Sequence, residues 1–295
     1  MCKRNWSAYN ESLIERGHIL MDIGFIKSQR RELTNMNKKK VGRPFLYPDS
    51  YVEFLAFIKI AFSISYRTVQ GIVRGLAEYI RMDEIHFTQL RRRIKKMCTN
   101  VRDIYNNSIG KSITLVVDAS GLTTSNKGHY IEDKWKKERR EYLKLHIAVD
   151  VKSKQIILFR VTKGTIHDSK KFVPMIKEIS KNNNITKVYA DKAYDSKTNF
   201  NLLDKMHIEP VISIRNNASG RTRKCKSRNE LVHLIQNIGY EKYKQLKNTG
   251  QRWIAKVVFS SLKRVLREHL LSRKFTMQKV ETTLKIMLYN RYISL

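Results

Sequence analysis

A change of sequence period near residue 112 limits the fold more than any other feature. Three segments rich in branched and aromatic residues follow it: SITLVVDAS (112–120), YLKLHIAVD (142–150) and QIILFRVTKG (155–164). Short apolar runs of this kind, bounded by polar turn residues, are typical of β-strands. The second and third runs are joined by VKSK, a connection of hairpin length, so we expect these two strands to be antiparallel.

Helix and strand patterns alternate after the third strand. Helices are predicted at 167–181 and 196–207, and strands at 185–191 and 209–214, with a long helix starting near residue 251. The order β-β-β-α-β-α-β predicts an α/β fold in which helices cover the faces of a mixed sheet. It is the order of a ribonuclease H-like core, although order alone also fits other α/β folds.

The N-terminal third is predicted to be helical. A polar and basic segment, QRRELTNMNKKKVGRP (29–44), is interpreted as a linker between helices. The predicted helices cover 7–26, 47–64, 64–80 and 86–97. We therefore expect a helical region at 1–110, and a core at 111–295 with a basic insertion at about 215–250.

The charge balance favours a polyanionic partner. Lys and Arg number 59 against 26 Asp and Glu, which gives a net charge of +33 spread along the chain. Nucleic acid is the commonest partner of such a field. A structural protein of ribosomal, histone-like or other RNA-binding type is the alternative, and the long apolar strands count against it.

A basic helix lies at the end of the helical region. The helices at 64–80 and 86–97 are expected to be joined by a short turn, and together they resemble a helix-turn-helix. The second could meet DNA, or its charges could simply form a solvated face. Its basic residues are Arg91, Arg92, Arg93, Lys95 and Lys96.

Cysteine usage and hydropathy suggest an intracellular protein without a membrane partner. The cysteines at positions 2, 98 and 225 are odd in number and far apart, which argues against a disulfide framework or a zinc site. No apolar run of membrane-spanning length and no signal peptide occurs.

Two predicted strands end in a carboxylate. Asp118 ends the first strand, and Asp191 ends ITKVYAD. In an open α/β sheet ligands gather beyond the strand ends, so the two carboxylates would share one crevice if their strands are neighbours. They would repel each other unless a hard divalent cation such as Mg²⁺ lay between them. The simpler alternative is that each aspartate only caps a turn or a helix.

Four segments carry a family resemblance: DASGL (118–122), WKKERREYLKLHIAVDVKSKQII (135–157), IHDSKKF (166–172) and ADKAYDS (190–196). They resemble the DDE transposases of bacterial and archaeal insertion sequences. The similarity is closest to the group named after insertion sequence five, within the insertion-sequence-four-like superfamily. It extends from SAYNESLIERG and GRPFLYPDS to LYNR near the end of the chain.

The resemblance implies a site of three acidic residues that bind two divalent ions, Mg²⁺ or Mn²⁺. It places the first two acids, both metal ligands, on Asp118 and Asp191. The third belongs to a pattern of Tyr, two residues, Arg, three residues, Glu, six residues and Lys. TGQRWIAKVVFSSLK supplies Arg252 and Lys263 at those spacings, but Thr249 stands in the Tyr position and Lys256 in the Glu position.

The residues around Lys256 suggest a helix with one basic stripe. At 100° per residue, Arg252, Lys256, Lys263 and Arg267 fall within about 60° of one another, and apolar residues including Trp253, Val257 and Val265 fill most of the remainder. The stripe is either a solvent-exposed face or a surface that contacts DNA phosphates, with Arg252 and Lys263 as the contacting residues. Lys256 cannot ligate a metal while it is protonated.

Three other features have simpler interpretations. Asp150 is expected to be a hairpin turn residue, and Asp168 the N-cap of a helix. The segment 215–228 carries six Arg or Lys and no acid, and we expect a flexible loop that becomes ordered on a DNA backbone.

The resemblance implies a transposase that cuts and joins DNA at the ends of its element. The expected partners are the terminal inverted repeats, target DNA and a second copy of the chain as a homodimer, and the expected location is the prokaryotic cytoplasm, at the nucleoid. Lys256 leaves an alternative open: a DNA-binding protein of transposase descent that does not cleave.

Overall fold

The computed structural model describes residues 5–80, 82–100, 112–124, 142–215 and 218–295. Its contacts divide the chain into two compact units. One combines Met1–Arg102 with Leu271–Leu295, and the other is Asp103–Leu270.

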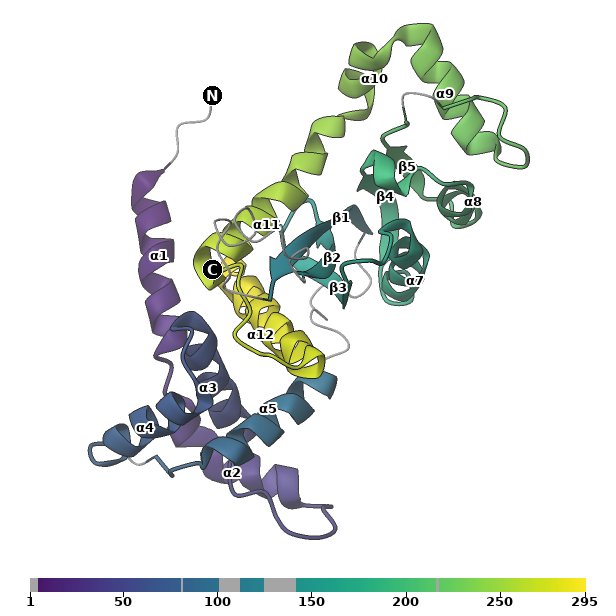
Figure 1. The fold of residues 1–295 in the computed structure, drawn as a ribbon. Helices are drawn as coiled ribbons and strands as arrows, with labels where there is room; N and C mark the ends of the chain where they lie inside the picture. The colour runs from purple at the N-terminus through teal and green to yellow at the C-terminus, as the bar shows by residue number, and fades with distance from the viewer. Residues whose placement is uncertain (1–4, 81, 101–111, 125–141, 216–217) are drawn as a thin grey trace, which may run out of the picture. The chain divides into compact units, whose positions relative to one another are not determined.

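A five-stranded mixed sheet forms the centre of the second unit (Figure 1). Its order is β3-β2-β1-β4-β5, in which β1, β2 and β3 are antiparallel neighbours and β4 and β5 run parallel to β1. The strands are β1 (Ser112–Thr123), β2 (Tyr142–Asp150), β3 (Ile156–Lys163), β4 (Asn184–Ala190) and β5 (Glu209–Ile212). This topology confirms the predicted ribonuclease H-like fold and the antiparallel pairing of the second and third strands.

Side chains alternate across β1, so each face of the sheet has its own apolar layer. Leu115 and Val117 face a cluster that includes Phe172 of α7 (Ser169–Ile179) and Phe200 of α8 (Lys197–Lys205). Val116 packs in a second cluster with Tyr189, Val211 and Ala255, the last from α11 (Trp253–Leu266). Helices therefore cover both faces of the sheet, so an active site is expected beyond the helix-covered faces.

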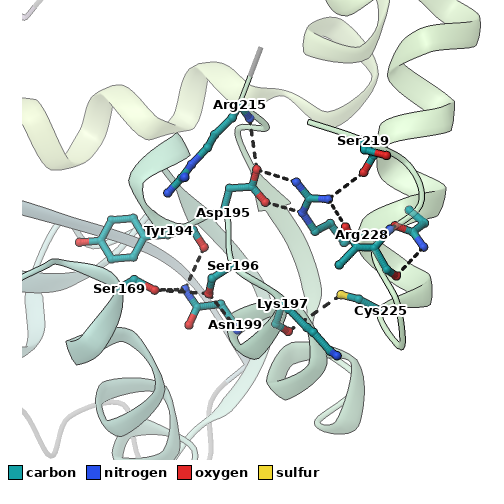
Figure 2. Close-up of polar contacts among 12 residues, drawn as sticks. Ser169, Tyr194, Asp195, Ser196, Lys197, Asn199, Arg215, Ser219, Cys225 and Arg228 are labelled. Atoms are coloured by element: carbon teal, nitrogen blue, oxygen red, sulfur yellow. Dashed lines mark hydrogen bonds and ion pairs between the residues drawn. The ribbon is translucent and has the colours of Figure 1, made fainter. Parts of the chain in front are cut away.

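Residues 218–228 of the basic segment are held by polar contacts, in contrast to the expected flexible loop (Figure 2). Asp195 is fully buried and accepts hydrogen bonds from Nε and Nη2 of Arg228, at 2.6 and 3.0 Å. The same guanidinium donates to the backbone oxygen of Ser219 at 3.0 Å and to Thr222 Oγ1 at 2.7 Å. The expectation of a flexible loop is therefore wrong for residues 218–228, because a buried ion pair fixes them to the segment after β4.

Two helices that the sequence analysis did not predict continue from this segment. They are α9 (Lys226–Ile238) and α10 (Tyr240–Lys247), and the short 3₁₀ helix η3 (Thr249–Arg252) then leads into α11. Leu231 and Tyr243 join the same apolar cluster as Leu115 and Val117. The segment is thus an extension of the core.

The first unit is helical. It contains α1 (Trp6–Leu20), α2 (Phe25–Asn37), α3 (Asp49–Ala61), α4 (Tyr66–Ala77), α5 (Phe87–Asn100) and α12 (Phe275–Ile293). The predicted helix at 7–26 breaks before Phe25, and most of the predicted linker is helix α2. The reason is one aromatic anchor: the Phe25 ring packs against Tyr51 and Phe54 of α3, with centroids 5.1 and 5.2 Å apart.

The last helix also differs from expectation. The sequence analysis placed 271–295 in the core, whereas α12 contacts α3 and α5 and belongs to the helical unit. Its buried Glu281 accepts hydrogen bonds from the backbone of Leu271 and Ser272, at 3.0 and 2.9 Å. A fragment that ends at residue 100 would lack this helix and expose the faces it covers.

The connection between α4 and α5 is longer than the expected short turn. It extends from 78 to 86, whereas a helix-turn-helix usually has a turn of about three or four residues. The hydroxyls of Tyr47 and Tyr51 hold it by donating to the backbone oxygens of Glu84 and Asp83, each at 2.8 Å.

In the described part of the chain, no helix has the length and apolar character needed to cross a bilayer.

The Asp195–Arg228 pair generates a stability prediction. We expect Asp195→Asn to lower the free energy of unfolding by roughly 3 kcal/mol, because it leaves a buried guanidinium without its counter-charge. Glu230→Gln is the matched control, since it breaks an exposed pair with Lys226 on the same helix, 3.7 Å apart, and should cost well under about 1 kcal/mol. Chemical denaturation measures both, and equal losses would contradict the proposed importance of the buried pair.

Candidate active site

Asp118 and Asp191 follow paired positions on two neighbouring strands of the sheet. The expectation that Asp118 ends its strand is wrong, because β1 continues to Thr123 and Asp118 pairs with Ile147 of β2. Strands β1 and β4 are parallel neighbours, and Val117 pairs with Ala190 in their register. Asp118 follows Val117 in β1, and Asp191 follows Ala190, the last residue of β4. The predicted placement of both carboxylates on adjacent strands is therefore confirmed, while their roles remain a prediction.

Asp118 is partly buried within β1. Its Oδ1 accepts a hydrogen bond from the backbone N–H of Ala119 at 2.8 Å. Burial raises the pKa of Asp118, and the negative charge of Asp191 adds to this effect. The hydrogen bond from Ala119 and the positive charges of Arg252 and Lys256 oppose it. The three charges among these influences place Asp118 in one electrostatic environment with Asp191, Arg252 and Lys256.

Asp191 is tied to the start of α11 by an ion pair. Its Oδ1 accepts from the N–H of Lys192 at 2.8 Å and lies 3.0 Å from Nη2 of Arg252. The same guanidinium donates through Nη1 to Ser213 Oγ, just after β5. Arg252, the N-cap residue of α11, therefore links the start of this helix to the ends of β4 and β5.

Lys256 lies one helical turn after Arg252. It is exposed, and its Nζ lies 5.4 Å from the ring centroid of Trp253. Within the described residues, no three His, Cys, Asp or Glu side chains come together as a group that could hold a metal. The two carboxylates, Asp118 and Asp191, and the two cations, Arg252 and Lys256, give a formal local charge of zero. A glutamate in place of Lys256 would make it −2.

The donor set still suits a divalent cation in part. Two carboxylates on adjacent strands match the way Mg²⁺ binds, through one or two carboxylates, water and substrate phosphate oxygens. Arg252 competes for Asp191, and Lys256 adds a repelling charge where a third carboxylate would attract. Asp118 and Asp191 therefore fit the ion, and Lys256 weakens the fit.

The expected basic stripe is only partly present. Lys263 pairs with Glu268, with Nζ to Oε1 at 2.9 Å, and Arg267 lies beyond the last residue of α11 with φ of 62°. Arg252 belongs to η3 rather than to the helix. Three apolar residues expected on the covered side are exposed instead: Trp253, Val257 and Val265. The stripe was predicted for one continuous helix over 252–267, whereas α11 begins at Trp253 and ends at Leu266.

The basic residues of α5 divide into two kinds. Arg91, Arg92 and Lys95 are exposed. Arg93 is mostly covered and pairs with Asp49, with Nη2 to Oδ1 at 2.6 Å. Arg91, Arg92 and Lys95 therefore face solvent, and Lys96 is exposed as well, with its Nζ 5.3 Å from the ring centroid of Phe45.

A buried polar cluster at β2 was missed by the sequence analysis. His146 is fully buried, with Nε2 3.0 Å from Thr162 Oγ1 and Nδ1 3.8 Å from Asp168 Oδ1. Asp168 occupies the N-cap position of α7, as expected, but its side chain makes no capping hydrogen bond. Its carboxylate lies 3.0 Å from Lys144 Nζ instead. Lys144 and His146 alternate with buried apolar residues in β2, and this period-two signal could have revealed them.

The remaining turn residue behaves as expected. Asp150 Oδ2 accepts hydrogen bonds from the N–H and the hydroxyl of Ser153, at 2.8 and 2.7 Å.

Two family models together match most of the chain. A family model described as "Transposase DDE domain" matches residues 109–291, and a second with the same description matches residues 14–127. Among solved structures, the piggyBac transposase synaptic complex with hairpin DNA is 11% identical, with 95% of this chain and 74% of that chain covered and a TM-score of 0.45. The Drosophila P element transposase strand transfer complex is 12% identical, with 90% and 70% covered and a TM-score of 0.33. The catalytic core domain of BIV integrase is 11% identical, with 59% and 80% covered and a TM-score of 0.26.

The buried histidine predicts a pH dependence of stability. Burial lowers the pKa of His146 to about 4; Asp168 opposes this shift, and Lys144 and Lys171 add to it. The folded protein thus holds the ring neutral while the unfolded chain takes up a proton below about pH 6.5, so the stabilisation is complete above that pH and is lost as the pH falls toward 4.

The measurement is the free energy of unfolding of the wild type and of His146→Gln. Between about pH 7.5 and 4.5 the wild type should lose about 2 to 3 kcal/mol more than the variant. Equal losses in the two proteins would show that the histidine does not titrate in this way.

Proposed function

We propose a function that proceeds from one fact: the chain belongs to the family of DDE transposases, whose domain model matches residues 109–291. It is a DDE-type DNA transposase, and enzymes of this class generally use divalent metal ions. We infer that it comes from an insertion sequence of the group named after insertion sequence five. Its substrates would be the terminal inverted repeats of that element and the target DNA.

Asp118 and Asp191 are the proposed metal ligands. The observation that carries this assignment is the parallel pairing of Val117 with Ala190, which puts the next residues, Asp118 and Asp191, at the same level of two neighbouring strands. Two Mg²⁺ or Mn²⁺ ions, when bound there, would activate a water and neutralise charge on the reacting phosphate. Arg252, already 3.0 Å from Asp191, would orient that carboxylate and meet a DNA phosphate, and Lys263 would act as a further phosphate contact.

Lys256 supports a second candidate, a DNA-binding protein of transposase descent with little or no cleavage activity. Its charge acts on Asp118 at the position where the family pattern has glutamate. Charges of +1 and +2 about 5 Å apart repel by roughly 2 kcal/mol in bulk water and by about 7 kcal/mol at an effective dielectric near 20. Because Lys256 is exposed, the smaller figure is the better guide.

DNA-end binding is proposed for the helical region at 1–110. The exposed Arg91, Arg92 and Lys95 of α5 support it, because several exposed basic side chains on one helix suit contacts with phosphates. The buried part of the region is completed by α12, so binding should be measured on the whole chain. A homodimer would allow both element ends to be held together.

Lys256→Glu tests the proposed metal site, because it changes the local charge from 0 to −2. We expect this variant to bind Mn²⁺ at least about tenfold more tightly in a calorimetric titration, because removing a repulsion of roughly 2 kcal/mol corresponds to more than tenfold in affinity. It should also cleave DNA that carries the element's own ends, whereas the chain with Lys256 should cleave poorly or not at all.

Arg264→Glu is the control for this experiment. Arg264 is exposed on the same helix and the substitution makes the same change in charge, but it lies two turns further along α11. It should leave Mn²⁺ binding close to that of the wild type. If the chain with Lys256 binds and cleaves as well as Lys256→Glu, the assignment of the third position is wrong.

The affinity of the chain for duplex DNA should depend strongly on salt concentration. If about 6 to 10 phosphates are contacted, affinity for duplex DNA should fall by about a thousandfold or more between roughly 50 and 200 mM salt. Replacing Arg91, Arg92 and Lys95 by alanine should reduce the slope of log K against log salt by about 2 to 3, since each phosphate contact contributes about 0.9. The same substitution at Lys27, Arg30 and Arg31, three exposed residues of α2, should change it far less. A flat salt response would refute the nucleic-acid proposal.

A further inference from the structure

The basic segment that joins α2 to Phe45 is a closed loop. The side chain of Asn37, the last residue of α2, donates from Nδ2 to the backbone oxygen of Phe45 at 3.0 Å and accepts from its N–H at 2.7 Å. These two bonds hold the ends of residues 38–44 together. The sequence KKKVGRP therefore projects as a loop, which we call the basic loop.

Phe45 attaches the basic loop to α5. Its ring centroid lies 4.5 Å from the Arg93 guanidinium carbon and 5.3 Å from Lys96 Nζ, both on α5, and 4.7 Å from Lys40 Nζ in the loop. The negative face of an aromatic ring attracts each of these cations. Three positive side chains are thus gathered around one ring, and the loop has a fixed place beside the basic helix.

The rest of the basic loop is open to solvent. Lys38, Lys39 and Arg43 are exposed, and Val41 at the loop's outer part is 98% exposed. Gly42 has φ of +88°, a conformation that glycine adopts at little cost, and it turns the chain directly before Arg43. The loop contains four basic residues and no acid, so its concentrated charge has no internal counterpart. Such a concentration is expected where a polyanion will neutralise it.

We propose that the basic loop enters the minor groove of duplex DNA, beside the major groove that α5 occupies, with Arg43 as the side chain that reaches into the groove. The proposal rests on the proposed function, in which α5 meets DNA. A helix about 10 to 12 Å wide fits the major groove, which is about 12 Å across, whereas the minor groove, about 6 Å wide, admits an extended segment or an arginine side chain. Narrow minor grooves carry an enhanced negative potential that attracts arginine.

The test uses base pairs that differ in one groove only. Inosine lacks the 2-amino group of guanine, so an inosine–cytosine pair keeps the major-groove pattern of G·C and shows the minor-groove pattern of A·T. The probes are short duplexes with a central block of A·T, G·C or inosine–cytosine pairs, and the protein is the full chain. We expect it to bind the inosine–cytosine duplex at least about fivefold more tightly than the G·C duplex, and nearly as tightly as the A·T duplex.

Three variants complete the test. Arg43→Ala should remove the preference for inosine–cytosine over G·C, and Phe45→Leu should reduce it, because leucine keeps apolar bulk but has no ring face to hold Arg93 and Lys96. Arg31→Ala, an exposed arginine of α2, should keep the preference. Circular dichroism checks that each variant is folded.

The outcomes separate this inference from the proposed function. Equal binding of the G·C and inosine–cytosine duplexes, or a preference that survives Arg43→Ala, would overturn minor-groove entry while leaving DNA binding by α5 intact. Absence of salt-dependent binding to all three duplexes would overturn the proposed function as well.

Discussion

Parallel pairing of β1 with β4 is the constraint on which the rest of the candidate site depends. Residues 115–117 of β1 and 188–190 of β4 are buried on both faces, so the register of the two strands is set by burial, and that register aligns Val117 with Ala190. The residues that follow, Asp118 within β1 and Asp191 directly after β4, then come at the same level of the two strands. A slip of either strand by one residue would turn its side chains to the opposite face and separate the carboxylates.

The ends of this sheet are held from two sides. Arg252 joins Asp191 to Ser213, which ties α11 to the ends of β4 and β5. The buried Asp195–Arg228 pair fastens the segment after β4 to the start of α9 (Figure 2). These contacts explain why a segment so rich in positive charge is ordered, since one of its arginines is used inside the fold. They also give Lys256 a defined place, because α11 begins directly after Arg252.

Much of the sheet could be predicted from the sequence, because strands buried on both faces give continuous apolar runs with clear ends. The two aspartates could be predicted for the same reason. Helix α2 was missed because Phe25 is its only buried residue, so its sequence looks like a solvated linker. The position of α12 depends on contacts with α3 and α5, far away in the sequence, and no local pattern encodes them. The side chains of Arg228 and Asp168 were judged by their own neighbours in the sequence, whereas their partners come from other segments.

The account's central claim is that Asp118 and Asp191 form one metal site and that Lys256 opposes it. Anomalous diffraction from crystals soaked in Mn²⁺ tests this most directly, with Lys256→Glu and the unaltered chain treated alike. The account predicts manganese peaks beside both carboxylates in the variant, and weaker peaks or none in the unaltered chain. Equal peaks in the two proteins, or peaks away from Asp118 and Asp191, would contradict it.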